Sequence, residues 1–155
     1  MNLKKSLQDQ FASNSICFGC GPANPNGLQL KSFVEDDKVI AHFRPKPFHH
    51  AFPNVLNGGV IGALLDCHCN WTASYSFMQK NNLEKPPCTV TSEYKIQLKR
   101  PTPMDAELTL IAELKSIDDN RITVYGELIA HGKVCDTCTG TFVTVSEGHP
   151  AFYRW

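Results

Sequence analysis

The sequence predicts a single α+β domain in which an antiparallel sheet of about six strands packs on one long helix. Three observations lead to this prediction. The chain has 155 residues, the length of one ordinary domain. Residues 59–80 show the apolar spacing of a helix, and segments of alternating apolar and polar residues lie on both sides of it. We therefore expect one domain over residues 1–155, with residues 1–26 as an N-terminal extension.

Short elements are expected before the long helix. Apolar residues at four-residue spacing predict a short helix over residues 3–11. Residues 14–27 are rich in Cys, Gly, Pro and Asn and predict an ordered loop. A first strand within residues 28–33 and a second over residues 38–44 are joined by two turn-forming aspartates, which is typical of a hairpin. Three prolines then predict irregular backbone over residues 45–56.

Four strands are expected after the helix. Alternating apolar and polar residues predict them over residues 88–98, 107–117, 121–130 and 133–145. Asp-Asp-Asn and His-Gly sequences at hairpin spacing predict tight turns between the last three. The expected order is a hairpin, the helix and a four-strand antiparallel meander. Such a sheet leaves edges that a second copy of the chain would cover, so we expect a homodimer or homotetramer.

The composition excludes several classes of function. Fifteen Lys plus Arg balance fifteen Asp plus Glu, so the formal net charge is zero and we expect no nucleic-acid partner. No apolar run approaches the length of about 18 residues typical of a membrane-spanning helix, so we expect no membrane association. The first residues lack the apolar core of a secretory signal, and we expect the cytoplasm as the compartment. There the seven cysteines stay reduced.

The strongest candidate for a functional site begins at Asn57-Gly58-Gly59 and continues to Asp66. Two glycines at a helix start leave the first backbone N–H groups open, and the helix dipole favours an anion or a polarised carbonyl there. Asp66 follows Gly59 by two turns, about 10 Å. It lies in an apolar run, where burying a charged carboxylate is unfavourable unless the carboxylate contacts solvent, a cation or a substrate. The structural alternative is that Asp66 bonds a nearby backbone group or Thr72, and that the glycines permit close packing.

Three segments of the chain resemble the hotdog-fold acyl-CoA thioesterases, specifically their phenylacetate-pathway-like branch. They are His-His-Ala-Phe-Pro-Asn-Val-Leu at residues 49–56, Asn-Gly-Gly-Val-Ile-Gly-Ala-Leu-Leu-Asp at residues 57–66 and Thr-Ser-Glu-Tyr-Lys-Ile-Gln-Leu-Lys-Arg-Pro at residues 91–101. The resemblance extends over about residues 27–145 and includes the strand order. Residues 17–28 resemble the start of a bacterial subgroup of uncharacterised hotdog proteins. The resemblance implies a single hotdog domain, in which the sheet wraps around one central helix.

The resemblance also implies roles for individual residues. The helix carboxylate of such thioesterases acts as nucleophile or general base on the thioester, a role that falls on Asp66. The N–H of the second motif glycine polarises the thioester carbonyl, which implies Gly59, with Gly58 shaping the turn. A serine or threonine on the next strand helps to hold the water, here Thr91, and His50 stands where relatives carry a glutamine lining the site. Because the family site forms between two subunits, the oxyanion donor and the carboxylate come from different chains.

One position departs from the family pattern, which is His-Gly-Gly. Asn57 takes the first place, so no imidazole titrates there. Asn57 either hydrogen-bonds the acyl carbonyl or caps the helix. Lys99 and Arg100 are candidates to bind the phosphates of coenzyme A, or they form a solvated strand edge. We expect a thioesterase that hydrolyses an acyl-CoA or a related thioester, and the departure at Asn57 keeps open an acyl-CoA-binding protein without catalysis.

Two Cys-x-x-Cys sequences and one histidine are the remaining candidates for chemistry. Cys17 and Cys20 would close a turn around Zn²⁺ if further ligands converged on it. Cys135 and Cys138 lie in an expected strand, where odd spacing points the two thiols to opposite faces. We therefore expect packing thiols and no cofactor, with zinc at Cys17 and Cys20 as the alternative. His68 is expected to be a satisfied histidine of the core or an interface.

Overall fold

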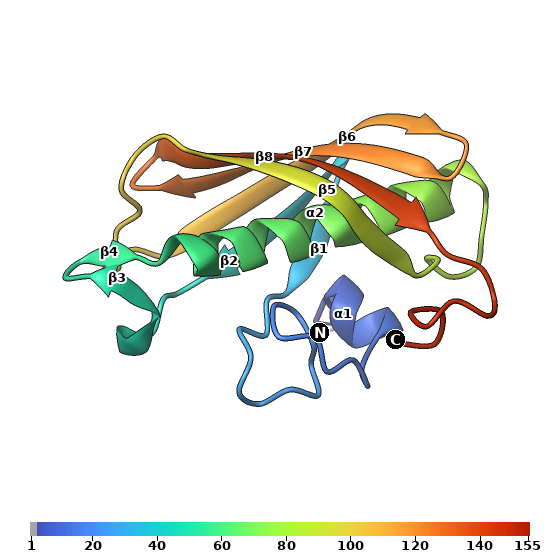
Figure 1. Cartoon of the computed structure of the whole chain (residues 1–155), viewed down its shortest axis with the longest axis horizontal. Helices are drawn as coiled ribbons and strands as arrows, with labels where there is room; N and C mark the ends of the chain where they lie inside the picture. The colour runs from blue at the N-terminus through green and yellow to red at the C-terminus, as the bar shows by residue number, and fades with distance from the viewer. Residues whose placement is uncertain (1–2) are drawn as a thin grey trace.

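The computed structural model describes residues 3–155, and it contains one long helix lying along one face of a six-stranded sheet (Figure 1). This is the α+β architecture that the sequence predicts. Its elements follow one another in the order α1 (Leu7–Phe11), β1 (Ser32–Glu35), β2 (Lys38–Phe43), the 3-10 helix η1 (Pro47–His49), β3 (His50–Phe52), β4 (Val55–Leu56), α2 (Gly58–Lys80), β5 (Thr89–Leu98), β6 (Leu108–Asp118), β7 (Arg121–Ala130) and β8 (Lys133–Thr144).

The sheet is antiparallel throughout, with its strands in the order β1-β2-β6-β7-β8-β5. α2 lies between this sheet and the N-terminal segment that carries α1 (Figure 1). The helix is therefore enclosed on two sides, which fits its nearly continuous apolar first half. No helix within residues 3–155 combines the length and the hydropathy needed to cross a membrane.

The predicted meander after the helix is wrong in one connection. β6, β7 and β8 do follow one another, joined by tight turns in which Asp119, His131 and Gly132 have positive φ angles of 53°, 50° and 72°. However, β5 pairs with β8 at the far edge of the sheet, and β6 pairs with β2. The connection over residues 99–107 contains two prolines and no hairpin turn, so it carries the chain from the edge to the middle of the sheet.

The elements near the N-terminus are shorter than predicted. α1 begins at Leu7, after the N-cap residue Ser6, and so covers only the second part of the helix expected over residues 3–11. β1 begins at Ser32, because the preceding backbone pairs with the loop before it rather than with a strand. The N–H of Leu28 donates to the carbonyl of Phe18 at 2.7 Å, and that of Leu30 donates to Gly19 at 3.1 Å. The N-terminal loop is thus hydrogen-bonded to the start of the sheet.

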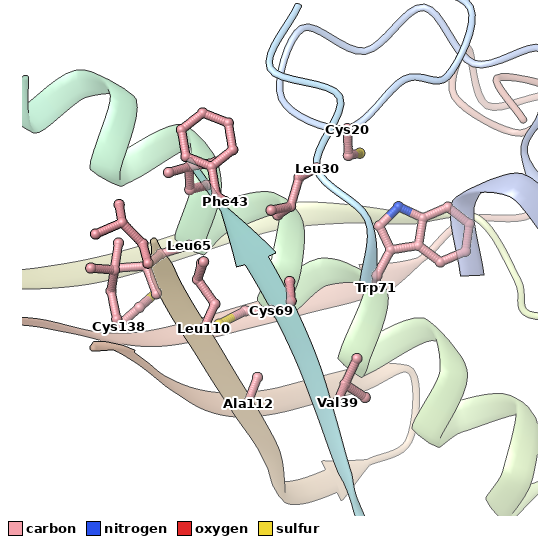
Figure 2. Close-up of a cluster of buried hydrophobic side chains, with 14 of the residues drawn as sticks. Cys20, Leu30, Val39, Phe43, Leu65, Cys69, Trp71, Leu110, Ala112 and Cys138 are labelled. Atoms are coloured by element: carbon pink, nitrogen blue, oxygen red, sulfur yellow. The ribbon is translucent and has the colours of Figure 1, made fainter. Parts of the chain in front are cut away.

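The core fills the space between the sheet and α2 (Figure 2). On β7, Gly126 permits close contact with the helix, since a Cβ there would come within 2.7 Å of the Cys69 sulfur. The buried side chains labelled in the close-up come from β2, β6, β8, α2 and the segment before β1, and they are Cys20, Leu30, Val39, Phe43, Leu65, Cys69, Trp71, Leu110, Ala112 and Cys138.

A buried polar network joins the N-terminal segment to the sheet and to α2. His68 is fully buried, with Nε2 at 2.9 Å from the carbonyl of Val39, which can only accept. Nδ1 of His68 therefore accepts the hydroxyl of Ser32 at 2.8 Å. Gln8 donates to this hydroxyl at 3.0 Å and accepts the N–H of Ser32 at 2.8 Å. Burial lowers the pKa of His68 to about 4, so His68 is the neutral core histidine that the sequence predicts.

The C-terminal tail packs against the body of the same chain. The Trp155 ring stacks on Trp71 of α2, with centroids 4.2 Å apart and planes inclined by 14°. The guanidinium of Arg154 donates to the carbonyl of Thr89 at the start of β5. α1 and the C-terminal tail lie on the same side of α2 (Figure 1).

Candidate functional site

The start of α2 is capped by the side chain of Asn57. Its Oδ1 accepts the N–H groups of Gly59 at 2.7 Å and Val60 at 3.3 Å. A Cβ at position 59 would lie 2.9 Å from this oxygen, so glycine lets the cap approach closely. The N–H of Gly59 is therefore occupied, contrary to the expectation of an open donor. The N–H of Gly58 has no hydrogen-bond acceptor among residues 3–155.

Asp66 lies two turns further along α2 and is half-buried. Thr91 on β5 donates its hydroxyl to Oδ1 of Asp66 at 2.7 Å. Thr72, the alternative partner, donates instead to the carbonyl of His68 at 2.8 Å. Burial raises the pKa of Asp66 above its ordinary value, and the Thr91 hydrogen bond opposes this effect. A carboxylate with one oxygen held and a raised pKa is suited to accept a proton in catalysis.

The helix start and the carboxylate are too far apart to act together within one chain. Gly58 and Asp66 are separated by eight residues, which is about 12 Å along the helix axis. A reacting carbonyl has to lie about 3 Å from both the oxyanion donor and the attacking group. A single chain therefore offers two half-sites, one at each place.

A cavity of about 330 Å³ opens beside the first half-site, at the start of α2. Lys99 and Arg100 line it together with Gly58, and both side chains are exposed. The backbone N–H groups of Lys99 and Arg100 donate to the carbonyl of Cys135 at 2.8 and 3.0 Å. These two bonds fix the position of the basic pair at the end of β5.

Asp136 also borders this cavity and was not singled out in the sequence. It is fully buried on β8, where Thr102 donates to Oδ2 at 2.6 Å and Oδ1 has no partner within residues 3–155. Burial raises the pKa of Asp136, while the hydrogen bond from Thr102 opposes the effect. The signal in the sequence that could have found it was a single aspartate within the segment expected to be a strand over residues 133–145.

His50 and its neighbour have different environments. His50 lies on β3, opposite Leu56, and its side chain is exposed. The adjacent residues Ala51 and Phe52, rather than His50, line the 330 Å³ cavity. His49 is buried, its Nδ1 accepts the N–H of Lys46 at 3.0 Å, and burial and Lys46 lower its pKa. The structure therefore brings Lys99, Arg100 and Gly58 together, but it does not bring His50 to them.

A larger cavity, of about 500 Å³, lies away from both half-sites. It is bounded by the β1–β2 hairpin and the second half of α2, including Val39, Tyr75 and Gln79. No residue of the candidate site lines it. Its charged lining residues are Asp36, Asp37, Lys38 and Lys80.

The cysteines are free thiols, and three of them form a cluster. Cys17 and Cys20 from the N-terminal loop meet Cys67 of α2, which directly follows Asp66. The side chains of Cys20 and Cys67, with the N–H groups of Cys20 and Gly19, hold the pKa of the Cys17 thiol well below its usual range. No local pattern indicates that Cys67 joins the loop pair, because the contact depends on how the loop folds over the helix.

The second Cys-x-x-Cys does not form one site. Cys138 lies against Cys69 of α2, and Cys135 contacts the carbonyl of Lys133 at 3.7 Å. Both thiols are buried, although they have different neighbours. The pairing of β7 with β8 is irregular next to Cys135: Leu128 pairs with Asp136 and Ile129 pairs with Val134, so the register shifts between these two pairs.

Searches with protein-family models and among curated proteins each found no match. Among solved structures, a thioesterase superfamily protein from Shewanella loihica PV-4 is 33% identical, with a TM-score of 0.66, over 81% of this chain and 98% of that chain. The E. coli PaaI protein from the phenylacetic acid degradation operon is 13% identical, with a TM-score of 0.65, over 77% and 81% of the two chains. The BH2602 protein from Bacillus halodurans, solved with CoA, is 24% identical, with a TM-score of 0.63, over 77% and 76%.

The similarities to the E. coli and Bacillus halodurans proteins, at 13% and 24% identity, support the fold only. The Shewanella protein carries more weight, because one third of the residues are identical and nearly all of that chain is covered. This agreement confirms the resemblance stated from residues 57–66 and 91–101. The chain belongs to the thioesterase superfamily and has its hotdog fold.

Proposed function

We propose that the protein hydrolyses an acyl-CoA or a related acyl thioester and that Asp66 supplies the catalytic carboxylate. The observation that carries this proposal is the half-buried Asp66 on an apolar helix, held by the hydroxyl of Thr91 at 2.7 Å. Burial raises its pKa, which makes it a stronger base than an ordinary carboxylate. Membership of the thioesterase superfamily supports the same reaction class.

The proposed chemistry uses Asp66 as general base. Thr91 occupies Oδ1, so Oδ2 is the oxygen that accepts a proton from water. The water oxygen forms a bond to the thioester carbon, and the carbon–sulfur bond then breaks. The proton taken up by Asp66 passes to the leaving sulfur, which gives a carboxylic acid and a free thiol. A route in which Asp66 attacks the thioester directly gives the same products through an acyl-enzyme.

We place the complete site between two copies of the chain. The separation of about 12 Å between Gly58 and Asp66 prevents one chain from presenting both to one thioester. β5 ends the sheet and leaves a free edge next to α2, and its Tyr94 and Leu98 side chains are 47% and 60% exposed. Pairing through this edge would place the helix start of one copy near Asp66 of another.

The donor for the developing oxyanion is assigned to the N–H of Gly58. Asn57 occupies the N–H of Gly59, so Gly59 can serve only after that side chain rotates away. The positive end of the α2 dipole favours negative charge at the same place. Lys99 and Arg100 at the mouth of the adjacent cavity are assigned to the phosphates of coenzyme A. The CoA in the Bacillus halodurans relative supports a CoA ligand for this fold.

A second function rests on one specific observation. The Asn57 cap blocks the donor that the family motif would use, so a protein that binds acyl-CoA without turnover also fits the helix start. Both functions suit a reducing cytoplasmic setting, where the free cysteines persist.

A panel of phenylacetyl, benzoyl, short-, medium- and long-chain acyl-CoA thioesters distinguishes the two functions. Hydrolysis is followed at the thioester absorbance or by chromatography, without thiol reagents. Turnover of at least one thioester is the expected result. A rise in the melting temperature with acyl-CoA, without turnover of any thioester, would favour the binding function instead. Size-exclusion chromatography with light scattering gives the oligomeric state, and a monomer that is fully active would contradict a site shared by two copies.

A further inference from the structure

The cysteine cluster has the geometry of a metal site. The sulfur atoms of Cys17, Cys20 and Cys67 all lie within 4.8 Å of one another. The Cys17 and Cys67 sulfurs are 3.7 Å apart. Zn–S bonds of about 2.3 Å at a tetrahedral angle place two thiolates about 3.8 Å apart. A disulfide would require about 2.05 Å. The observed spacing therefore suits three thiols around one ion.

The loop is shaped to bring its thiols to the helix. A Cβ at position 19 would lie 2.4 Å from the sulfur of Cys67, and one at position 21 would lie 2.4 Å from the backbone of Cys17. Glycine at both positions is therefore needed for the loop to close over Cys67. Cys20 comes from this loop, and it lies on the same side of α2 as Trp71 (Figure 2). The cluster joins two segments that are fifty residues apart in the sequence.

The chemistry of the donors selects the kind of ion. Three sulfur donors without a carboxylate or histidine among them suit a soft or borderline ion and disfavour Mg²⁺ or Ca²⁺. Cys20 is 7% exposed, while Cys17 and Cys67 are half-buried, so the site is shielded but still reachable. Zn²⁺ is redox-inert and accepts such a set, with its fourth position open to water or a small ligand.

We propose that Cys17, Cys20 and Cys67 bind one Zn²⁺ and that this ion fastens the N-terminal loop to α2. The ion has no assigned part in the proposed hydrolysis, because none of its three ligands is assigned to substrate, but the site adjoins Asp66 through Cys67. Metal removal is expected to loosen residues 14–27 and to lower the melting temperature.

The test starts with protein purified without chelators under a phosphine reductant. Mass spectrometry of the metal content is expected to give about one zinc per chain. Cys17→Ser and Cys67→Ser are expected to lose it, whereas Cys88→Ser, which changes a half-buried thiol outside the cluster, should keep it. Zinc that persists in Cys67→Ser would overturn the assignment of Cys67.

Cobalt titration of the wild-type protein keeps the test decisive if a serine variant fails to fold. After chelation and removal of the chelator, Co²⁺ is expected to produce thiolate charge-transfer absorbance that saturates at one ion per chain. It should also quench the tryptophan fluorescence, because Trp71 neighbours Cys20 and stacks on Trp155, the second tryptophan of the chain. A protein that carries no zinc and gives no cobalt–thiolate band contradicts the proposal. So does a Cys17–Cys67 or Cys17–Cys20 disulfide in protein isolated under anaerobic conditions.

Discussion

The buried network around His68 leads to a quantitative prediction about stability and pH. His68 has a pKa of about 4 in the folded protein, because burial disfavours its charged form. In the unfolded chain its pKa is about 6.5. Between these values the unfolded chain binds a proton that the folded protein does not, so acidification favours unfolding. The difference corresponds to about 3 kcal/mol of unfolding free energy, lost as the pH falls from about 6.5 to 4.

Replacing His68 by glutamine tests this reasoning. Glutamine does not titrate, and it keeps at most part of the bonds to Ser32 and Val39. At pH 7.5 the variant is expected to be about 2–4 kcal/mol less stable, since a buried hydrogen bond is lost and a partner is left unsatisfied. At pH 4 most of this deficit should disappear, because the wild type has by then lost the contribution of its neutral histidine.

The assay is urea unfolding of both proteins at several pH values between 7.5 and 4. His50→Gln is the matched control, since the side chain of His50 is exposed on β3 and forms no ion pair or hydrogen bond within residues 3–155, and it should follow the wild type at every pH. Carboxylates that titrate in this window are common to all three proteins and cancel in the comparison. Parallel pH dependences of the wild type and His68→Gln would refute the argument.

Three further predictions concern the candidate site. Thr91→Val removes the hydrogen bond that lowers the pKa of Asp66, so the acidic limb of the pH profile of kcat/KM should move to higher pH. Thr139→Val, at an exposed threonine, should leave this limb in place. An unmoved limb in Thr91→Val would contradict the role of the Thr91–Asp66 hydrogen bond. Asn57→Ala removes the helix cap, so it should lower stability by about 1 kcal/mol in urea unfolding. It should also leave kcat/KM unchanged or higher, whereas a large loss would show that Asn57 acts on the substrate. Asp136→Asn removes a buried charge, so the melting temperature of the variant should rise relative to that of the wild type as the pH increases from 4 to 8. A difference in melting temperature that does not change with pH would contradict the raised pKa of Asp136.

The parts of the fold that local sequence determines could be predicted. α2 follows from its apolar spacing, and the turn at His131-Gly132 follows from residues that accept positive φ angles. The partner of β5 could not be predicted, because alternation identifies a strand and the face it buries but not its neighbour. The start of β1 was misplaced for a related reason, since residues 28–31 bond to a distant loop whose path the sequence does not specify.

The candidate site was predictable in its chemistry and less so in its geometry. The hydrogen bond between Thr91 and Asp66 joins two residues that the family resemblance groups in one site. Capping the helix by accepting the N–H of Gly59 was one of two roles expected for Asn57, the other being a hydrogen bond to the acyl carbonyl. The sequence could not decide between them, because both roles use the same side-chain amide. Asp136 and the approach of Cys67 to Cys17 depend on tertiary contacts, which no local pattern encodes.

The most direct test of the central claim is the hydrolysis of the best acyl-CoA substrate by the wild type and Asp66→Asn, measured as kcat/KM. The asparagine side chain keeps an oxygen that can accept from Thr91 but cannot take a proton from water. We therefore expect a loss of about a hundredfold or more, in a variant that still unfolds cooperatively. Asp105→Asn, at an exposed carboxylate, should keep full activity. Turnover that survives in Asp66→Asn would contradict the assignment of Asp66 as the catalytic carboxylate.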